Sequence, residues 1–254
     1  MKRYLSLAGL LCAAVLSACE KNAVQDIAGT VPGARIKFFN FGVNAPGVNF
    51  YANDIKMTAI SSGSGAESTL GTSYGGVGSG GFYSGIEPGQ YTFTGKIAAA
   101  TDKDLAISSL AASVVDGKFY SFFQSGFYNT TAKTIDAFIV EDDIPAIDFS
   151  VAYVRFVNVI SNSTPQTLFV KTSTADEIAI GGPVAYKTAG AFTAVPNGVY
   201  ALTTRNTGSA ATAITRADVS FSAGRVYTIA SRGDMTVVST TLANRPILDN
   251  TTNR

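Results

Sequence analysis

The feature that most constrains this chain is an internal duplication. Three short blocks recur in the same order: "IKFFN" at 36–40 and "VRFVN" at 154–158, "EPGQYT" at 87–92 and "VPNGVYA" at 195–201, "DGKFYS" at 116–121 and "AGRVYT" at 223–228. The similarity of the last pair extends, without insertions, to Gly126 in the first copy and Gly233 in the second. Chance could supply one such pair, whereas three in register over roughly a hundred residues indicate two copies of one unit. We therefore expect two domains of the same fold.

The recurring blocks have the composition of strands and turns. In the first block of each copy, apolar residues alternate with Lys37 or Arg155, which predicts a strand with one buried face and one face that carries the cation toward water. Proline with glycine or asparagine, just before Tyr91 and Tyr200, predicts a turn. No segment after the amino-terminal leader keeps a helical spacing, so we expect an all-β protein.

Two sheets have to cover each other's apolar faces, so each copy is expected to form an immunoglobulin-like or transthyretin-like β-sandwich. The cysteine pair and core tryptophan of antibody domains are missing, so aromatic residues must fill the cores. The candidates are Phe38, Tyr91, Phe93, Tyr120 and Phe122 in the first copy, and Phe156, Phe169, Tyr200, Phe221 and Tyr227 in the second. The expected boundaries are repeats at 34–140 and 151–245, a solvated acidic linker at 141–150 and a frayed tail at 246–254.

The amino terminus has the layout of a secretory signal. Three residues, Met-Lys-Arg, precede an apolar run that ends in "LSAC" at 16–19, which predicts a signal peptide over 1–18. The run is too short for a membrane-spanning helix, which needs about 20 residues. "LSAC" resembles the bacterial lipobox, which implies a lipid on Cys19 followed by a tether over 19–33. The alternative is a plain secretory peptide cut after Ala18.

The lipobox resemblance also implies a cellular address. Glu20 is not the Asp associated with retention in the inner membrane, which implies an outer-membrane lipoprotein on either the periplasmic or the cell-surface face. The expected partners are the membrane, through the lipid, and a protein or glycan of the cell envelope. The net charge is +1 and the basic residues are dispersed, so the pattern of a nucleic-acid-binding protein is missing.

Longer stretches of the first copy resemble a known bacterial family. "ARIKFFNFGVNAPGVNFYAND" at 34–54, the Pro-Gly-x-Tyr block and "DGKFYSFFQSG" at 116–126 together resemble the family named domain of unknown function 4397. The second copy is less similar because "ISNSTPQTLFV" lacks the Asn-Ala-Pro loop, and Asn40 and Asn158 stand where the family usually has histidine. The resemblance implies a secreted or lipid-anchored sandwich, often in tandem, and supplies no activity and no catalytic residues.

The residue types exclude much of enzyme chemistry. The chain has no histidine, and its two cysteines, Cys12 and Cys19, lie in the leader and at the anchor, so Ser-His-Asp triads, thiol nucleophiles and the common zinc sites are excluded. The acids at 141–143 or 176–177 could form a glycosidase pair, and the linker acids at 141–143 could form a calcium site. We favour solvated acids, because neighbours in a strand point to opposite faces. We therefore expect no enzyme, no catalytic residue, no metal site and no cofactor.

A Gly/Ser-rich loop over 61–85 contains the one local candidate for a binding site. Its segment "GVGSGG" at 76–81 matches a dinucleotide fingerprint, which we reject because a turn and a strand follow it instead of a helix. Tyr74, Phe82 and Tyr83 are candidates for contacts to a sugar or a partner surface. The alternative is that Phe82 and Tyr83 begin a core strand.

The sequence favours a non-enzymatic envelope lipoprotein that serves as an adhesion, scaffold or interaction module for an unknown ligand. The alternative is a glycan-binding accessory lipoprotein of a polysaccharide-uptake system.

Overall fold

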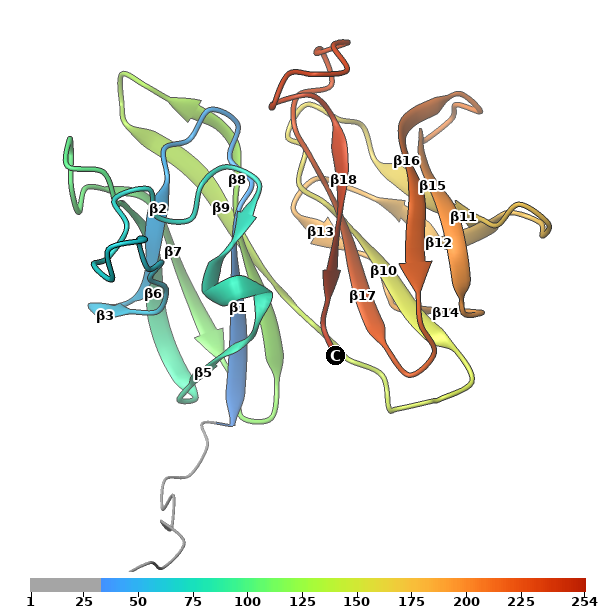
Figure 1. Ribbon diagram of the computed structural model, residues 1–254, viewed down its shortest axis with the longest axis horizontal. Coiled ribbons are helices and arrows are strands. Elements are labelled where there is room, and N and C mark those ends of the chain that lie inside the picture. The colour runs from blue at the N-terminus through green and yellow to red at the C-terminus, as the bar shows by residue number, and fades with distance from the viewer. Residues whose placement is uncertain (1–32) are drawn as a thin grey trace, which may run out of the picture. The chain divides into compact units, whose positions relative to one another are not determined.

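The computed structural model describes residues 33–254, so the predicted signal peptide, Cys19 and the tether up to residue 32 lie outside the described residues. Strands make up the regular structure of the described part, with one short 3-10 turn, η2 (Gly78–Gly81), and no α-helix (Figure 1). No helix in that part is long and apolar enough to cross a membrane. The prediction of an all-β protein is confirmed.

The first repeat is a sandwich of two sheets. One sheet has the order β4-β1-β8-β9, with β5 also paired to β1. It consists of β1 (Ala34–Asn40), β4 (Gly76–Val77), β5 (Ser84–Ile86), β8 (Phe119–Asn129) and β9 (Thr134–Glu141). The other has the order β3-β2-β6-β7 and consists of β2 (Val48–Ala52), β3 (Ile55–Lys56), β6 (Gly89–Ile97) and β7 (Ala106–Val114).

The second repeat has the same connectivity, strand for strand. One sheet has the order β13-β10-β17-β18, with β14 also paired to β10, and the other has the order β12-β11-β15-β16. These strands are β10 (Ala152–Asn158), β11 (Gln166–Lys171), β12 (Ile178–Val184), β13 (Thr188–Ala189), β14 (Thr193–Val195), β15 (Gly198–Asn206), β16 (Thr212–Phe221), β17 (Val226–Arg232) and β18 (Ile247–Thr252). Figure 1 shows the strands of each repeat in two layers.

The register of the two repeats agrees with the duplication inferred from the sequence. The first strand of each repeat pairs in parallel with the strand of the third block, so that Ile36 lies opposite Tyr120 and Val154 opposite Tyr227. The first and second strands lie in different sheets, whereas a constant-type immunoglobulin domain keeps them in one sheet. The connectivity of both repeats therefore differs from that of a constant-type immunoglobulin domain.

The expectation of a frayed tail after residue 245 is wrong. Residues 247–252 form β18, which pairs with β17 along its length and is the counterpart of β9 in the first repeat. Leu248 is fully buried in the core of the second repeat. After Pro246 the tail is polar except for this side chain and its neighbour Ile247, which is why local composition did not indicate a strand.

Aromatic rings fill the first core, as the composition required. Phe38 contacts Phe50, Phe93 and Phe122 with ring centroids 5.2 to 6.2 Å apart. The predicted core residues of both repeats are buried or packed against the core clusters, with one exception. Phe169 lies instead on the outer face, where its ring is 4.2 Å from the guanidinium of Arg205. Its neighbours in the strand, Leu168 and Val170, point inward and fill the core.

In both repeats the tyrosine that follows the proline-containing turn stabilises that turn. The Tyr91 hydroxyl donates to the carbonyl oxygen of Glu87 at 2.9 Å, and the Tyr200 hydroxyl donates to that of Pro196 at 2.8 Å. Each tyrosine therefore closes the turn that precedes its own strand. The same contact in both repeats explains why this block recurs in the sequence.

Candidate functional site

The strand faces that carry Lys37 and Arg155 are buried, so the prediction that these cations point to water is wrong. Their residues are 2% and 1% exposed. The neighbouring positions on the same faces, Phe39 and Val157, belong to one apolar cluster that spans both repeats. Its members are Phe39, Phe41, Phe123 and Phe138 from the first repeat and Val157, Val159 and Ala230 from the second.

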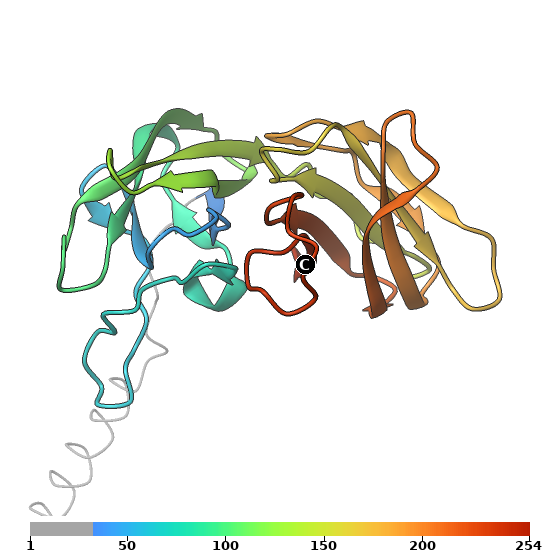
Figure 2. The same cartoon turned by 90° about the horizontal axis from the view of Figure 1, so that it is seen from above.

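This shared cluster joins the β1-β8-β9 sheet to the β10-β17-β18 sheet. Figure 1 and Figure 2 show these two sheets on the facing sides of the repeats. Both first strands have the burial pattern of a strand covered on two faces. A run such as Phe38-Phe39 is typical of a strand buried on both sides, and this was the pattern in the sequence that could have indicated the junction.

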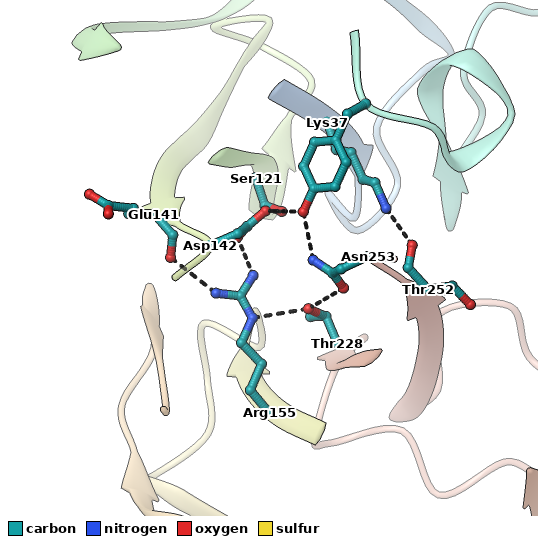
Figure 3. Close-up of polar contacts among 9 residues, drawn as sticks. Lys37, Ser121, Glu141, Asp142, Arg155, Thr228, Thr252 and Asn253 are labelled. Atoms are coloured by element: carbon teal, nitrogen blue, oxygen red, sulfur yellow. Dashed lines mark hydrogen bonds and ion pairs between the residues drawn. The ribbon is translucent and has the colours of Figure 1, made fainter. Parts of the chain in front are cut away.

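A buried carboxylate lies at the centre of the polar part of this junction (Figure 3). The side chain of Asp142, directly after β9, is 0% exposed and forms an ion pair with the Arg155 guanidinium. It also accepts hydrogen bonds from the hydroxyls of Ser121 at 2.7 Å and Tyr83 at 2.6 Å. The expectation that the linker acids are solvated is therefore wrong for Asp142, whereas Asp143 is exposed.

The polar groups around Asp142 form a closed ring of hydrogen bonds. Arg155 Nε donates to the Thr228 hydroxyl at 2.9 Å, and that hydroxyl donates to Asn253 Oδ1 at 2.9 Å. Asn253 Nδ2 donates to the Tyr83 hydroxyl at 2.6 Å, which in turn donates to Asp142. Every hydroxyl of the ring both accepts and donates, an arrangement in which neighbouring bonds strengthen one another. The ring connects Tyr83, in the loop before β5 of the first repeat, to Asn253, directly after β18 of the second.

Lys37 is the second buried cation of the junction. Its ammonium donates to the main-chain oxygen of Thr252 at 2.5 Å and lies 4.3 Å from the centre of the Tyr83 ring. No carboxylate of the described chain lies within ion-pair distance of it. Burial lowers the pKa of Lys37 to about 8, an effect that Asp142 opposes and Arg155 adds to. Asp142 therefore pairs with Arg155 and acts on Lys37 only through longer-range attraction.

The three loop aromatics have different surroundings. Burial, followed by the charge of Asp142, raises the pKa of Tyr83 well above its ordinary value, so this hydroxyl stays protonated. The Tyr74 ring lies 4.8 Å from the Arg232 guanidinium of the second repeat, and burial raises the pKa of Tyr74 as well. Phe82 is 77% exposed, and β5 begins only at residue 84, so the alternative that Phe82 and Tyr83 begin a core strand is wrong.

A groove of about 790 Å³ lies between the repeats beside this junction. Phe82, Tyr83 and Lys37 line it from the first repeat, and Arg225, Asn250 and Arg254 from the second, whereas Tyr74 does not line it. Its volume falls within the range of small-molecule sites, about 300 to 1,000 Å³, which often lie at domain interfaces. The groove thus brings two of the three predicted aromatic residues together with cations that the sequence did not indicate.

The glycine-rich segment at 76–81 positions Phe82 at this groove. It forms β4 and η2, within which Ser79, Gly80 and Gly81 have φ values of 52°, 65° and 84°. Such left-handed backbone favours glycine, and no other atom would meet a Cβ at Gly81. The segment leads into strand β5, so it has no helix to complete a dinucleotide site.

The other acids considered from the sequence do not form a carboxylate pair. Glu177 accepts both hydrogen bonds of a bidentate contact from Arg205, each at 2.7 Å. Glu141 pairs with Lys118 at 2.6 Å on the surface. Within residues 33–254, no group of three or more His, Cys, Asp or Glu residues is placed to hold a metal ion.

No protein-family model and no curated protein matches this sequence. Among solved structures, the chain is distantly similar to a proposed cell adhesion protein of Bacteroides ovatus ATCC 8483, with 8% identity, a TM-score of 0.27, and coverage of 89% of this chain and 99% of that one. A leucine-rich repeat protein of Bacteroides thetaiotaomicron VPI-5482 has 10% identity, a TM-score of 0.20, and coverage of 79% and 25%. Likenesses this distant carry no argument about function.

Proposed function

We propose that this chain is a non-enzymatic interaction module of the bacterial cell envelope, anchored by a lipid on Cys19, whose two repeats together present one groove to a ligand. The groove of about 790 Å³ between the repeats is the observation that carries the proposal. Neither repeat makes this site alone, because its lining residues come from both.

The buried junction supports a binding role for the groove. Tyr83 from one repeat and Asn253 from the other line the groove and are bonded to each other at 2.6 Å. The apolar cluster below them fixes the two walls relative to each other. A site with fixed walls loses less conformational entropy when a ligand binds, which favours affinity.

The residue types support a non-enzymatic role. The chain has no histidine, and no cysteine follows Cys19, so it lacks the side chains of the common hydrolytic triads. The one fully buried carboxylate of the junction, Asp142, is engaged by three donors. Those contacts hold the repeats together and occupy its oxygens.

The anchor and the outer-membrane address belong to the same proposal. The lipobox-like residues 16–19 and the polar segment that follows them support a lipid-bearing tether in front of the sandwiches. Metabolic labelling with an alkyne fatty acid should tag the wild-type chain and leave Cys19→Ala untagged. Equal tagging of both chains would refute the anchor. A membrane-impermeant reagent on intact cells then separates the cell-surface face from the periplasmic one.

A second candidate, a glycan-binding accessory lipoprotein for polysaccharide uptake, is favoured by Phe82. An aromatic side chain 77% exposed at the edge of a groove offers a flat face for a sugar ring. A glycan array tests it, with Phe82→Ala as the variant and Phe149→Ala as the matched control, since Phe149 is 82% exposed and outside the groove. Saccharide binding that only Phe82→Ala removes supports this candidate, and a uniformly silent array contradicts it.

A further inference from the structure

The ammonium group of Lys37 is incompletely paired for a buried charge. It has three donors, and the described residues supply one oxygen acceptor, that of Thr252, and the face of the Tyr83 ring. The oxygens of Asp142 are already taken by Arg155, Ser121 and Tyr83. Burying a charge is costly unless it is paired and hydrogen-bonded, so this lysine has a strong physical preference for a further anion.

The groove that Lys37 lines has a positive electrostatic character. Arg225 and Arg254 also line it, and no acidic side chain does among the described lining residues. The net charge of the lining residues remains positive even when a carboxylate at residue 254 is included. A cleft lined by charges of one sign concentrates ligands of the opposite sign.

Two further polar atoms on the lining residues lack partners. Asn250 Oδ1 is a buried acceptor and Arg254 Nε a buried donor, and neither has a hydrogen-bond partner within the described part of the chain. Buried polar atoms nearly always have one. A ligand that satisfies both atoms must donate as well as accept. A saccharide hydroxyl does both, whereas an inorganic anion with only acceptor oxygens does not.

We infer that the groove binds an acidic saccharide, with its carboxylate on Arg225 and facing the buried charge of Lys37, its ring against Phe82, and its hydroxyls at Asn250 and Arg254. This inference rests on the proposed function, since it names the ligand class of the same groove. It differs from a general glycan site in requiring a negative charge on the sugar.

The protonation of Lys37 gives the inference a specific signature. Burial lowers the pKa of this lysine to about 8, so a part of the molecules carries it neutral at pH 8. An anion beside the ammonium favours the charged form and raises its pKa. Binding of an acidic sugar at pH 8 must therefore take up protons, and binding at pH 6 must not, because the lysine is already charged there.

Calorimetric titration of the full chain in detergent tests the inference. The probes are trisaccharides of galacturonate, glucuronate and mannuronate, each beside its methyl ester, which keeps the ring and hydroxyls and removes the charge. At least one acid should bind about tenfold or more tightly than its ester, because a charge-assisted contact is lost in the ester. Phe82→Ala and Arg225→Gln should each weaken binding about fivefold or more. The exposed residues Phe149 and Lys171 lie outside the groove, so Phe149→Ala and Lys171→Gln should leave it unchanged.

Titrations at pH 8 in buffers of different ionisation enthalpy report the proton uptake. Lys37→Met should abolish it, and its thermal melt confirms that the variant is folded. The inference is overturned if no acid binds, if the esters bind equally well, or if Lys37→Met leaves affinity and proton uptake unchanged. In each of these cases, acylation of Cys19 together with binding of a neutral glycan or an envelope protein would leave the proposed function standing.

Discussion

Removing the charge of Asp142 should separate the two repeats energetically. The Asp142 side chain is 0% exposed, and Asp142→Asn keeps its shape while removing its charge. Arg155 and Lys37, which are 1% and 2% exposed, then lose the nearby negative charge. Breaking a buried ion pair by removing one partner costs about 3 to 5 kcal/mol. We expect a loss of that size in the free energy of unfolding, which is a large fraction of the total stability of an ordinary protein.

A double-mutant cycle isolates the contribution of the pair. Arg155→Met alone should cost less than Asp142→Asn, because Ser121 and Tyr83 still donate to the carboxylate. The double variant should be less destabilised than the sum of the single variants, with a coupling energy of about 2 kcal/mol.

Guanidinium unfolding at pH 7, followed by circular dichroism and by tyrosine fluorescence, is the assay. Because Asp142 joins the repeats, the variant should unfold in two transitions where the wild type has one. Asp143→Asn is the matched control, since Asp143 is exposed and its variant should change stability by less than about 0.5 kcal/mol. A loss below about 1 kcal/mol for Asp142→Asn, with no coupling to Arg155, would refute the buried pair.

Three other substitutions test separate parts of the structure. The pKa of Lys37 is lowered from 10.5 to about 8 in the folded protein. The unfolded chain therefore binds more protons than the folded protein between these pH values. The free energy of unfolding of the wild type should rise by up to about 3 kcal/mol from pH 8 to pH 10. Urea titrations at each pH should show that Lys37→Met lacks this rise. Parallel pH profiles would contradict this reasoning. Tyr83→Phe removes one donor from Asp142 and should lower stability by about 1 to 3 kcal/mol in thermal melts, and an unchanged melt would count against the ring. Leu248→Ala should cost about 2 to 5 kcal/mol, because this side chain is 0% exposed, whereas a frayed tail would tolerate it without loss.

The sequence predicted the sandwiches because their signals are local and occur twice. The turn before Tyr91 and Tyr200 depends on residues within a few positions, and the same hydroxyl contact closes it in both repeats. Strand alternation is equally local. Repetition then separated these patterns from chance, which explains why the fold class was predictable.

The junction was not predictable in this way, because its partners are far apart in the chain. Lys37 between two apolar residues has the pattern of an amphipathic strand, and only the partner repeat makes its outer face buried. The apolar residue Phe39 on the same face was the available indication. Asn253, directly after β18, belongs to the ring of hydrogen bonds, yet the composition of this segment resembled a polar tail.

The groove was predicted in part for a similar reason. Phe82 and Tyr83 stood out because exposed aromatics in a glycine-rich loop are unusual, and both line the groove. Arg225 and Asn250 were missed because nothing in their local sequence distinguishes them from ordinary surface residues. They become relevant only because the second repeat places them opposite the loop of the first.

The solvent exposure of Lys37 tests the central claim most directly, namely that the cation-bearing faces of the two repeats are buried against each other. Amine-reactive labelling of the intact protein, with mass spectrometry to follow each lysine, measures it. Lys37, at 2% exposure, should react at least about tenfold more slowly than the exposed Lys103 and Lys171, since modification requires the junction to open. Labelling of Lys37 as fast as those two lysines would contradict the buried junction.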